Sequence, residues 1–238
     1  MTELPPILLS ALTGFISGLL LSMPVGPVNL TIINGGAQRG FKWAMLIGLG
    51  AATMDVIYCT IAFTGFSSFF GIPFVKTFME VFTFVFMLFL GIKFLSAKTV
   101  IAPTQFGAAA SRIEERIGER LHPHSAFMTG FVRVLGNFGV LLFWIVAAAY
   151  FMSHEAYFTP YEWVEDTIAT KGAFITGVAL GANLWFFAVS YMSSRGQGRL
   201  SERTLLHMEH FSGICLLVLG FYHGVLIALQ LARHRHGI

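Results

Sequence analysis

Six long apolar stretches constrain this chain more than any other feature of its sequence. Each is far longer than a buried strand, and a helix that spans a bilayer needs about 20 apolar residues. Backbone that faces lipid must satisfy its own hydrogen bonds, as a helix does. The pattern predicts an all-α integral membrane protein with six transmembrane helices. The stretches run from Ile7 to Asn34, Trp43 to Phe63, Phe78 to Leu95, Phe127 to Phe151, Phe174 to Met192 and Phe211 to Leu231.

The composition supports a membrane-embedded chain and excludes several soluble classes. Only 11% of the 238 residues are charged, against roughly 25% in an ordinary soluble domain. A soluble enzyme, a disordered chain and a nucleic-acid-binding protein are therefore excluded, and membrane lipids are the expected surroundings. No nucleotide-binding loop of the Gly-Lys-Ser type occurs. We predict no enzymatic activity, no cofactor and no metal site.

Basic residues are distributed unevenly between the two sides of the predicted bundle. Ten Lys and Arg residues lie on the side of the first, third and fifth connections, and four lie on the other side. The positive-inside rule therefore places both termini outside a bacterial inner membrane. The first apolar stretch is expected to remain in the mature protein, because no cleavable signal pattern surrounds it.

A weak internal repeat divides the chain into two halves of three spans. Halves with an odd number of spans have opposite orientations, which is the inverted-repeat construction of many secondary transporters. We predict one transmembrane domain over residues 1–238, with repeats at 7–95 and 127–231. The cytoplasmic linker at 96–126 contains the capping-box pattern Ser111 to Glu114, which predicts an amphipathic helix on the membrane surface or a solvated linker helix. The repeated motifs are Thr13-Gly14-Phe15 with Thr129-Gly130-Phe131, Leu49-Gly50-Ala51 with Leu180-Gly181-Ala182, and Leu88-Phe89-Leu90-Gly91 with Leu217-Val218-Leu219-Gly220.

Four polar residues are predicted to share one layer near the middle of the bilayer: Asp55, Asn137, Asn183 and His223. A rise of 1.5 Å per residue puts Asp55 and Asn137 each about 18 Å from the cytoplasmic end of its span. An ionised Asp at the centre of a helix costs about 2.5 to 3.5 kcal/mol, so this carboxyl must face the bundle interior. We predict that Asp55 and His223 couple solute movement to ions and that the asparagines bind the solute.

These residues also have structural interpretations. Asp55 would then hydrogen-bond to a neighbouring helix, His223 would pack in the core, and the two asparagines would bridge helices. Arg133 lies one turn nearer the cytoplasm than Asn137. It either extends to the headgroups, neutralises Asp55 or binds a solute carboxylate, and we include it among the predicted solute-binding residues.

The first span contains the sharpest motif of the chain, Met23-Pro24-Val25-Gly26-Pro27-Val28-Asn29. Each proline removes an amide donor and obstructs the carbonyl four residues earlier, so the helix must break or kink here. Irregular backbone at this depth is tolerated where protein or water covers it. We therefore predict a solute-binding site that includes Gly26, Pro27 and Asn29, with an ordinary proline kink as the alternative.

The chain resembles the LysE/RhtB family of amino-acid exporters at three places: Gly26-Pro27-Val28-Asn29, the run from Gly35 to Gly40, and Asp55. Asn137 matches the family's Asn of the fourth span, and Trp185 falls where the family's Trp of the fifth span would lie. We therefore expect an exporter of amino acids or similar small polar solutes, and the resemblance implies that export is driven by an ion gradient, such as that of protons, or by the membrane potential, with Trp185 in the site. The chain departs from the family at two positions. Phe138 stands where the family usually has a proline, and Val25 stands where it often has one.

Three other classes of function remain as alternatives. A metal-ion or other inorganic-ion exporter is disfavoured because the membrane layer lacks paired carboxylates and a Cys/His cluster. A thiol-disulfide oxidoreductase requires Cys59 and Cys215 to meet, yet they lie about 24 Å and 6 Å from the cytoplasmic ends of their spans. A structural membrane subunit has no evident use for a broken helix and a buried Asp. Homo-oligomers are left open, because glycine contacts within a bundle and between protomers look alike.

Overall fold

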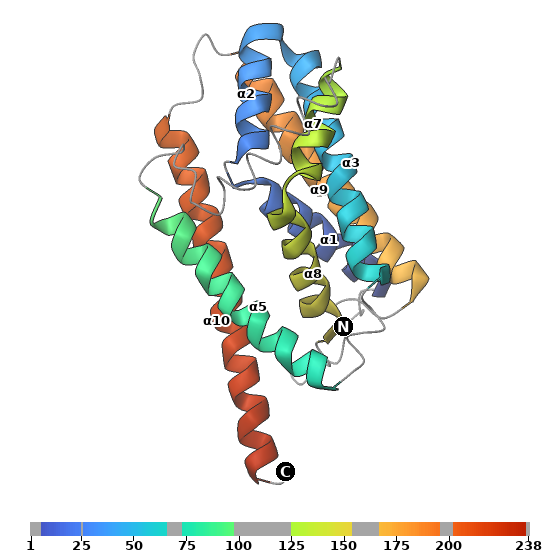
Figure 1. Ribbon diagram of the computed structural model, residues 1–238, viewed down its shortest axis with the longest axis vertical. Coiled ribbons are helices and arrows are strands. Elements are labelled where there is room, and N and C mark those ends of the chain that lie inside the picture. Colours follow the sequence, from blue (N-terminus) through green and yellow to red (C-terminus); the bar gives the residue numbers. More distant parts are fainter. Residues whose placement is uncertain are drawn as a thin grey trace.

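The computed structural model describes residues 6–24, 26–65, 73–97, 125–153, 167–195 and 202–236, and these form only helices apart from short connections (Figure 1). By length and composition, four helices can each cross a membrane, and the number rises to six if each of two bent pairs is one span. The prediction of an all-α membrane protein is confirmed. The helices are α1 (Pro6–Ser22), α2 (Pro27–Arg39), α3 (Phe41–Gly65), α5 (Pro73–Leu95), α7 (Ala126–Leu135), α8 (Phe138–Ser153), α9 (Ile168–Arg195) and α10 (Glu202–His236).

Two of the predicted spans are broken. The axes of α1 and α2 differ by 75°, and those of α7 and α8 by 65°. The first break follows from Pro24 and Pro27, since neither residue can donate a backbone hydrogen bond. The second break forms without a proline because the Asn137 side chain accepts from the Gly139 amide at 3.1 Å and starts a new helix. The predicted linker helix at 111–121 lies outside the described residues.

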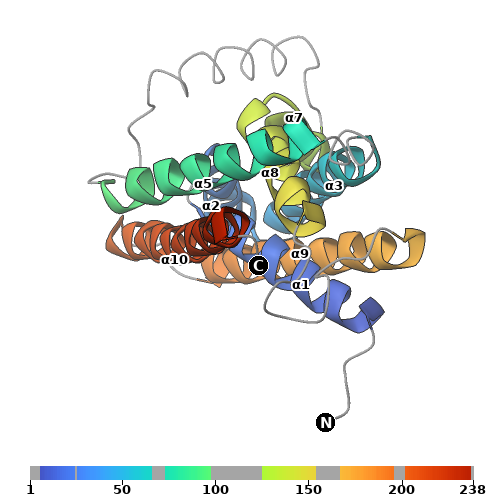
Figure 2. The ribbon, with the colours of Figure 1, turned by 90° about the horizontal axis from the view of Figure 1, so that it is seen from below.

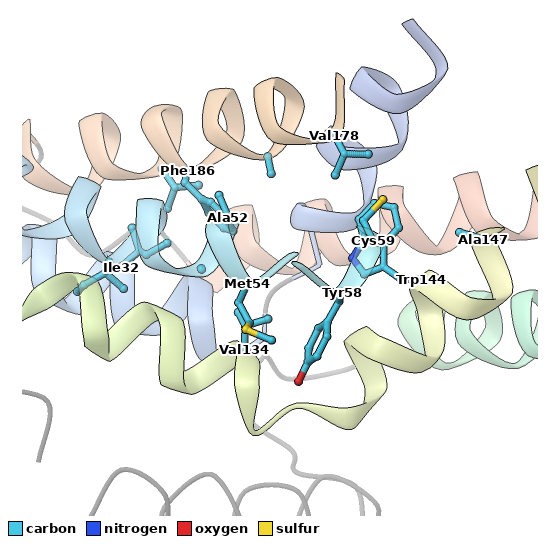
Figure 3. Close-up of a cluster of buried hydrophobic side chains, with 14 of the residues drawn as sticks. Ile32, Ala52, Met54, Tyr58, Cys59, Val134, Trp144, Ala147, Val178 and Phe186 are labelled. Carbon is cyan, nitrogen blue, oxygen red and sulfur yellow. The ribbon is translucent and has the colours of Figure 1, made fainter. Parts of the chain in front are cut away.

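The long helix α3 lies at the centre of the bundle. It packs against α2, α7, α8 and α9. Its inward side chains include Met54 and Tyr58, which point toward α7 and α8, while Ala52 lies beside Phe186 of α9 (Figure 3). The helices α5 and α10 lie side by side (Figure 2) and join the rest through contacts of α5 with α8, through His223 of α10 against Tyr150, and through Leu205 of α10 in the buried core.

Glycines bring the central helices into backbone contact in two matching places. A Cβ at Gly14 of α1 would overlap the Phe174 carbonyl of α9, and one at Gly130 of α7 would overlap the Ile47 carbonyl of α3. Without side chains at these positions, the helix pairs α1–α9 and α7–α3 approach closely. These contacts fix the two broken spans onto the two long central helices.

The reverse contacts come from Gly50 and Gly177. Gly50 of α3 faces the backbone of Phe127 and Phe131, and Gly177 of α9 faces the backbone of Ala11 and Phe15. By contact, Gly50 therefore corresponds to Gly177, one helical turn before the Gly181 that the sequence motif suggests. In Figure 1, α1 leads upward into α2 whereas α7 leads downward into α8. Two inverted repeats stay a prediction, which this contact pattern and these opposite directions favour.

Replacing Gly130 or Gly14 by Ala is expected to destabilise the bundle, because the new methyl group would force backbone apart at the helix contact. Overpacking of this kind costs about 1 to 3 kcal/mol. Thermal unfolding of the detergent-solubilised protein should show a lower apparent melting temperature. Gly172→Ala is the matched control, since a Cβ at Gly172 of α9 meets no atom within 4 Å. Equal melting temperatures for Gly130→Ala and Gly172→Ala would contradict the packing described.

Candidate functional site

Asn29 holds the first break together. It lies in the first turn of α2 and is 4% exposed. Its amide nitrogen donates to the Ser22 and Pro24 carbonyls, both at 2.8 Å. These carbonyls are left without helical partners where α1 ends. One side chain therefore satisfies the Ser22 carbonyl, which could not be left unpaired inside a membrane, and adds a second donor to the Pro24 carbonyl, which also accepts from the Gly26 amide at 2.9 Å.

Trp185 ties this break to the neighbouring long helix. Its indole N–H, on α9, donates to the Asn29 side-chain oxygen at 3.2 Å. The sequence predicted both residues in the site, and the structure brings them together. With both amide hydrogens donated to carbonyls and its oxygen accepting from Trp185, Asn29 supports the break.

Space is open beside Gly26, between the two half-helices. Apart from Gly26 itself and its two chain neighbours, no atom of the described residues lies within 4 Å of the point where a Cβ of Gly26 would stand. The φ of −106° and ψ of −175° are extended values that any residue adopts, so neither the backbone conformation nor helix packing requires glycine here. Pro27 next to it is exposed. Gly26 and Pro27 thus lie at an open edge of the break.

The second break has a different set of partners. The Tyr58 hydroxyl of α3 donates to the Leu135 carbonyl, at the end of α7, at 2.7 Å. Figure 3 shows the Tyr58 ring pointing toward the non-helical stretch between α7 and α8. Asn137 is half-buried in this stretch and caps α8 through its own side chain. Here a side chain from a long central helix donates directly to a carbonyl released by a broken span, whereas at the first break Trp185 acts through Asn29.

Asp55 lies one turn before Tyr58 on α3 and is 6% exposed. The prediction that its carboxyl faces the bundle interior is confirmed. The carboxyl lies beside the indole of Trp144, which is fully buried on α8. The Trp144 N–H does not meet hydrogen-bonding geometry with it and has no other partner in the part of the chain that the structure describes. Asp55 therefore sits in a dry environment with a donor close by.

His223 and Asn183 lie on other helices of the bundle. His223 of α10 is 1% exposed, and its ring packs edge-on against Tyr150 of α8 with the centroids 5.0 Å apart. Asn183 of α9 donates to the Ala179 carbonyl of its own helix at 2.8 Å, and its side-chain oxygen is buried without a partner among the described residues. A single layer that joins both residues to Asp55 stays a prediction.

Arg133 lies in the last turn of α7, before the second break, and is half-buried. Its roles in neutralising Asp55 or binding a carboxylate stay predictions. Cys59 belongs to the same buried cluster as Trp144 (Figure 3), whereas Cys215 is partly exposed on α10, and both thiols are free. In the described ranges, no three His, Cys, Asp or Glu side chains are grouped as a metal ion would need.

Tyr58 and Trp144 are the two site residues that the sequence analysis missed. Tyr58 follows Asp55 by three residues, so the helical period places both on one face of α3. That spacing was available in the sequence. Trp144 follows Asn137 by seven residues, or two turns, and the same rule places it on the Asn137 side of α8. Its closeness to Asp55 depends on how α8 packs against α3, which periodicity does not reveal.

Comparison with known proteins confirms the family resemblance. A family model described as LysE type translocator matches residues 19–226, a range that contains both breaks, Asp55 and Trp185. The Bacillus subtilis (strain 168) protein named "Putative amino acid efflux protein YcgF" is 32% identical over 215 residues, which make up 90% of this chain and 94% of that protein. No solved structure matches the chain.

Asn29→Asp should weaken the first break, because a carboxylate can still accept from Trp185 but cannot donate to the Ser22 and Pro24 carbonyls. A buried backbone acceptor left unsatisfied costs about 1 to 3 kcal/mol, and the new charge adds to this cost. We expect a clear loss of thermal stability in detergent. The control is Asn34→Asp, at an exposed position of the same helix, which should unfold close to the unaltered protein. A stable Asn29→Asp variant would be evidence against the bracing role.

Proposed function

The chain belongs to the LysE type translocator family, and from this premise we propose that it exports amino acids from a bacterial cell. We place it in the inner membrane with the odd-numbered connections in the cytoplasm and both termini outside, as the distribution of Lys and Arg favours. The relative from Bacillus subtilis, whose name refers to amino acid efflux, supports this class of solute. The observation that carries the proposal is the open space beside Gly26 in a braced break of the first span.

The N-terminal end of α2 is suited to the carboxylate of an amino acid. Pro27 has no amide hydrogen, and the amides of Val28 and Asn29 lie in the first turn, where no helical carbonyl accepts from them. The helix dipole adds partial positive charge at this end. Half-helix N-termini point at anionic solute groups in transporters built from broken helices. The solute carboxylate would bind these amides and occupy the space beside Gly26.

The second break supplies a comparable end. The helix α8 also begins near mid-height of the bundle, as α2 does (Figure 1). Asn137 caps it, and the unpartnered side-chain oxygen of Asn183 on α9 is an acceptor suited to an ammonium group. In this proposal Asn137, Asn183 and Arg133 contribute to solute binding, while Asn29 and Trp185 keep the first break in shape.

Asp55 is the group that we assign to ion coupling. Its carboxyl is nearly buried in α3, so neutralisation by a proton removes the cost of a charge inside the membrane. The residue would take up a proton from outside and release it to the cytoplasm while the solute leaves in exchange. Each charge that crosses the membrane potential contributes about 2.3 kcal/mol per 100 mV. His223 is proposed as a second titrating group on α10.

Gly26→Val should impair transport without unfolding the protein, because its side chain fills the space proposed for the solute while the backbone keeps its extended conformation. Purified protein in liposomes preloaded with each of the twenty amino acids in turn would be tested for exchange against the labelled compound. The unaltered protein should exchange at least one of them, and Gly26→Val should raise the half-saturating concentration at least tenfold. Gly172→Ala serves as the control with a side chain added in open space elsewhere. If Gly26→Val exchanges the amino acid with the same half-saturating concentration as the unaltered protein, the proposed site is wrong.

Asp55→Asn should separate coupling from exchange, because the amide keeps the shape of the carboxyl but carries no titratable proton. In the same liposomes, export driven by an imposed pH gradient should be abolished, and amino-acid exchange without a gradient should continue. Glu209→Gln, in the membrane-spanning part of α10, is the matched control and should keep gradient-driven export. Gradient-driven export by Asp55→Asn at the normal rate would remove Asp55 from the mechanism.

A further inference from the structure

Tyr58 and Trp185 occupy matching positions on the two long central helices. Tyr58 follows Gly50 by eight residues on α3, and Trp185 follows Gly177 by eight residues on α9. Gly50 and Gly177 correspond because each packs against the backbone of a first half-helix, α7 and α1 respectively. Positions 58 and 185 therefore correspond because of the helix contacts, independently of which residues occupy them.

Tyr58 and Trp185 also make equivalent interactions, since each donates one side-chain hydrogen bond at a break. The Tyr58 hydroxyl donates to the Leu135 carbonyl at the second break, at 2.7 Å. The Trp185 indole donates at 3.2 Å to Asn29, which in turn binds the carbonyls of the first break. In each case an aromatic ring buries its apolar surface in the bundle and offers one polar hydrogen. In each case that hydrogen reaches the broken span that lies in the other half of the chain.

We propose that Tyr58 and Trp185 are a matched pair of positioning residues, each of which fixes one of the two breaks by a single donated hydrogen bond. Each break is thereby held from the opposite half of the chain, so the two ends that we propose for solute binding are set relative to one rigid pair of helices, α3 and α9. Tyr58 also links Asp55 to the second break, since the two side chains lie one turn apart on α3. The transport part of this inference rests on the proposed function.

The first test follows the two breaks by hydrogen–deuterium exchange of purified protein in lipid nanodiscs and needs no solute. Tyr58→Phe should speed exchange in peptides that cover residues 134–141 by about tenfold, the factor that corresponds to about 1.4 kcal/mol. It should leave peptides that cover residues 22–31 unchanged. Trp185→Phe should do the reverse. Tyr191→Phe, an exposed position of α9, is the matched control and should change neither segment.

Conservative replacement adds a test that a general packing defect would fail. Trp185→Tyr keeps a polar hydrogen on an aromatic ring and uses the residue found at the matching position of α3. It should restore slow exchange at residues 22–31, which Trp185→Phe loses. If Trp185→Tyr behaves like Trp185→Phe, or if either Phe variant changes both breaks equally, the pairing is wrong. Because the two Phe variants are tested separately, poor folding of one leaves the other decisive.

Transport gives the second readout. With the amino acid that exchanges fastest among the twenty as the probe, both Phe variants should raise the half-saturating concentration about tenfold while the maximal rate changes less than threefold. Trp185→Tyr should return the concentration to within threefold of the unaltered protein. A loss confined to the maximal rate would overturn the positioning role. If the unaltered protein exchanges no amino acid, the proposed function fails, and the exchange measurements on the two breaks still decide the pairing.

Discussion

Backbone carbonyls released inside a membrane need donors from the protein itself, and the architecture of this bundle is organised around that need. Water cannot take up these groups in the hydrocarbon region, where each unpaired one costs several kcal/mol. Two spans are nevertheless broken. The first is sustained by Asn29, which donates to two carbonyls, and the second by Tyr58, which donates to one. In both breaks a side-chain donor replaces the missing helical partner, and a long central helix supplies it directly at the second break and braces it at the first.

Close backbone packing makes such support dependable. Gly14 and Gly130 let the first half-helices lie directly against α9 and α3, so the distance from each long helix to its break is set by main chain. Because the backbone distance is fixed, a donor at the end of a long side chain loses little further conformational entropy when it binds its acceptor. The pair α5 and α10 lies outside this arrangement and contacts the remainder through α8 and through Leu205 of α10 in the core. The closest backbone packing is thus found in α1, α3, α7 and α9, the helical segments beside the breaks.

Local chemistry made the spans and the first break predictable, because long apolar runs and a Pro-Gly-Pro-like motif act on the backbone of their own segment. The burial of Asp55 was predictable for the same reason, since a charge on an apolar helix has only the interior to face. The second break was not, because Phe138 replaces the expected proline and the Asn137 cap acts through a side chain. The partners of Tyr58 and Trp144 were not predictable either, because they lie on helices more than 75 residues away along the chain, although the spacing of Tyr58 from Asp55 was visible in the sequence. The repeated Leu-Gly motif pairs Gly50 with Gly181, whereas the helix contacts pair Gly50 with Gly177. A Leu-Gly pair is common in membrane helices, so it does not identify which glycine makes the equivalent contact.

The allocation of hydrogen bonds at the first break also bears on what a site of this kind can distinguish. Asn29 uses both amide hydrogens on carbonyls and its oxygen on Trp185, so it has little capacity left for a solute. The polar groups that remain are main-chain amides, and these recognise a carboxylate without reading the rest of the molecule. Under the proposed function, such a site accepts the part that all amino acids share. Discrimination between them then falls to the side chains around the open space beside Gly26, where one added methyl group changes affinity by only about 1 kcal/mol, so selectivity among apolar amino acids of similar size should be modest.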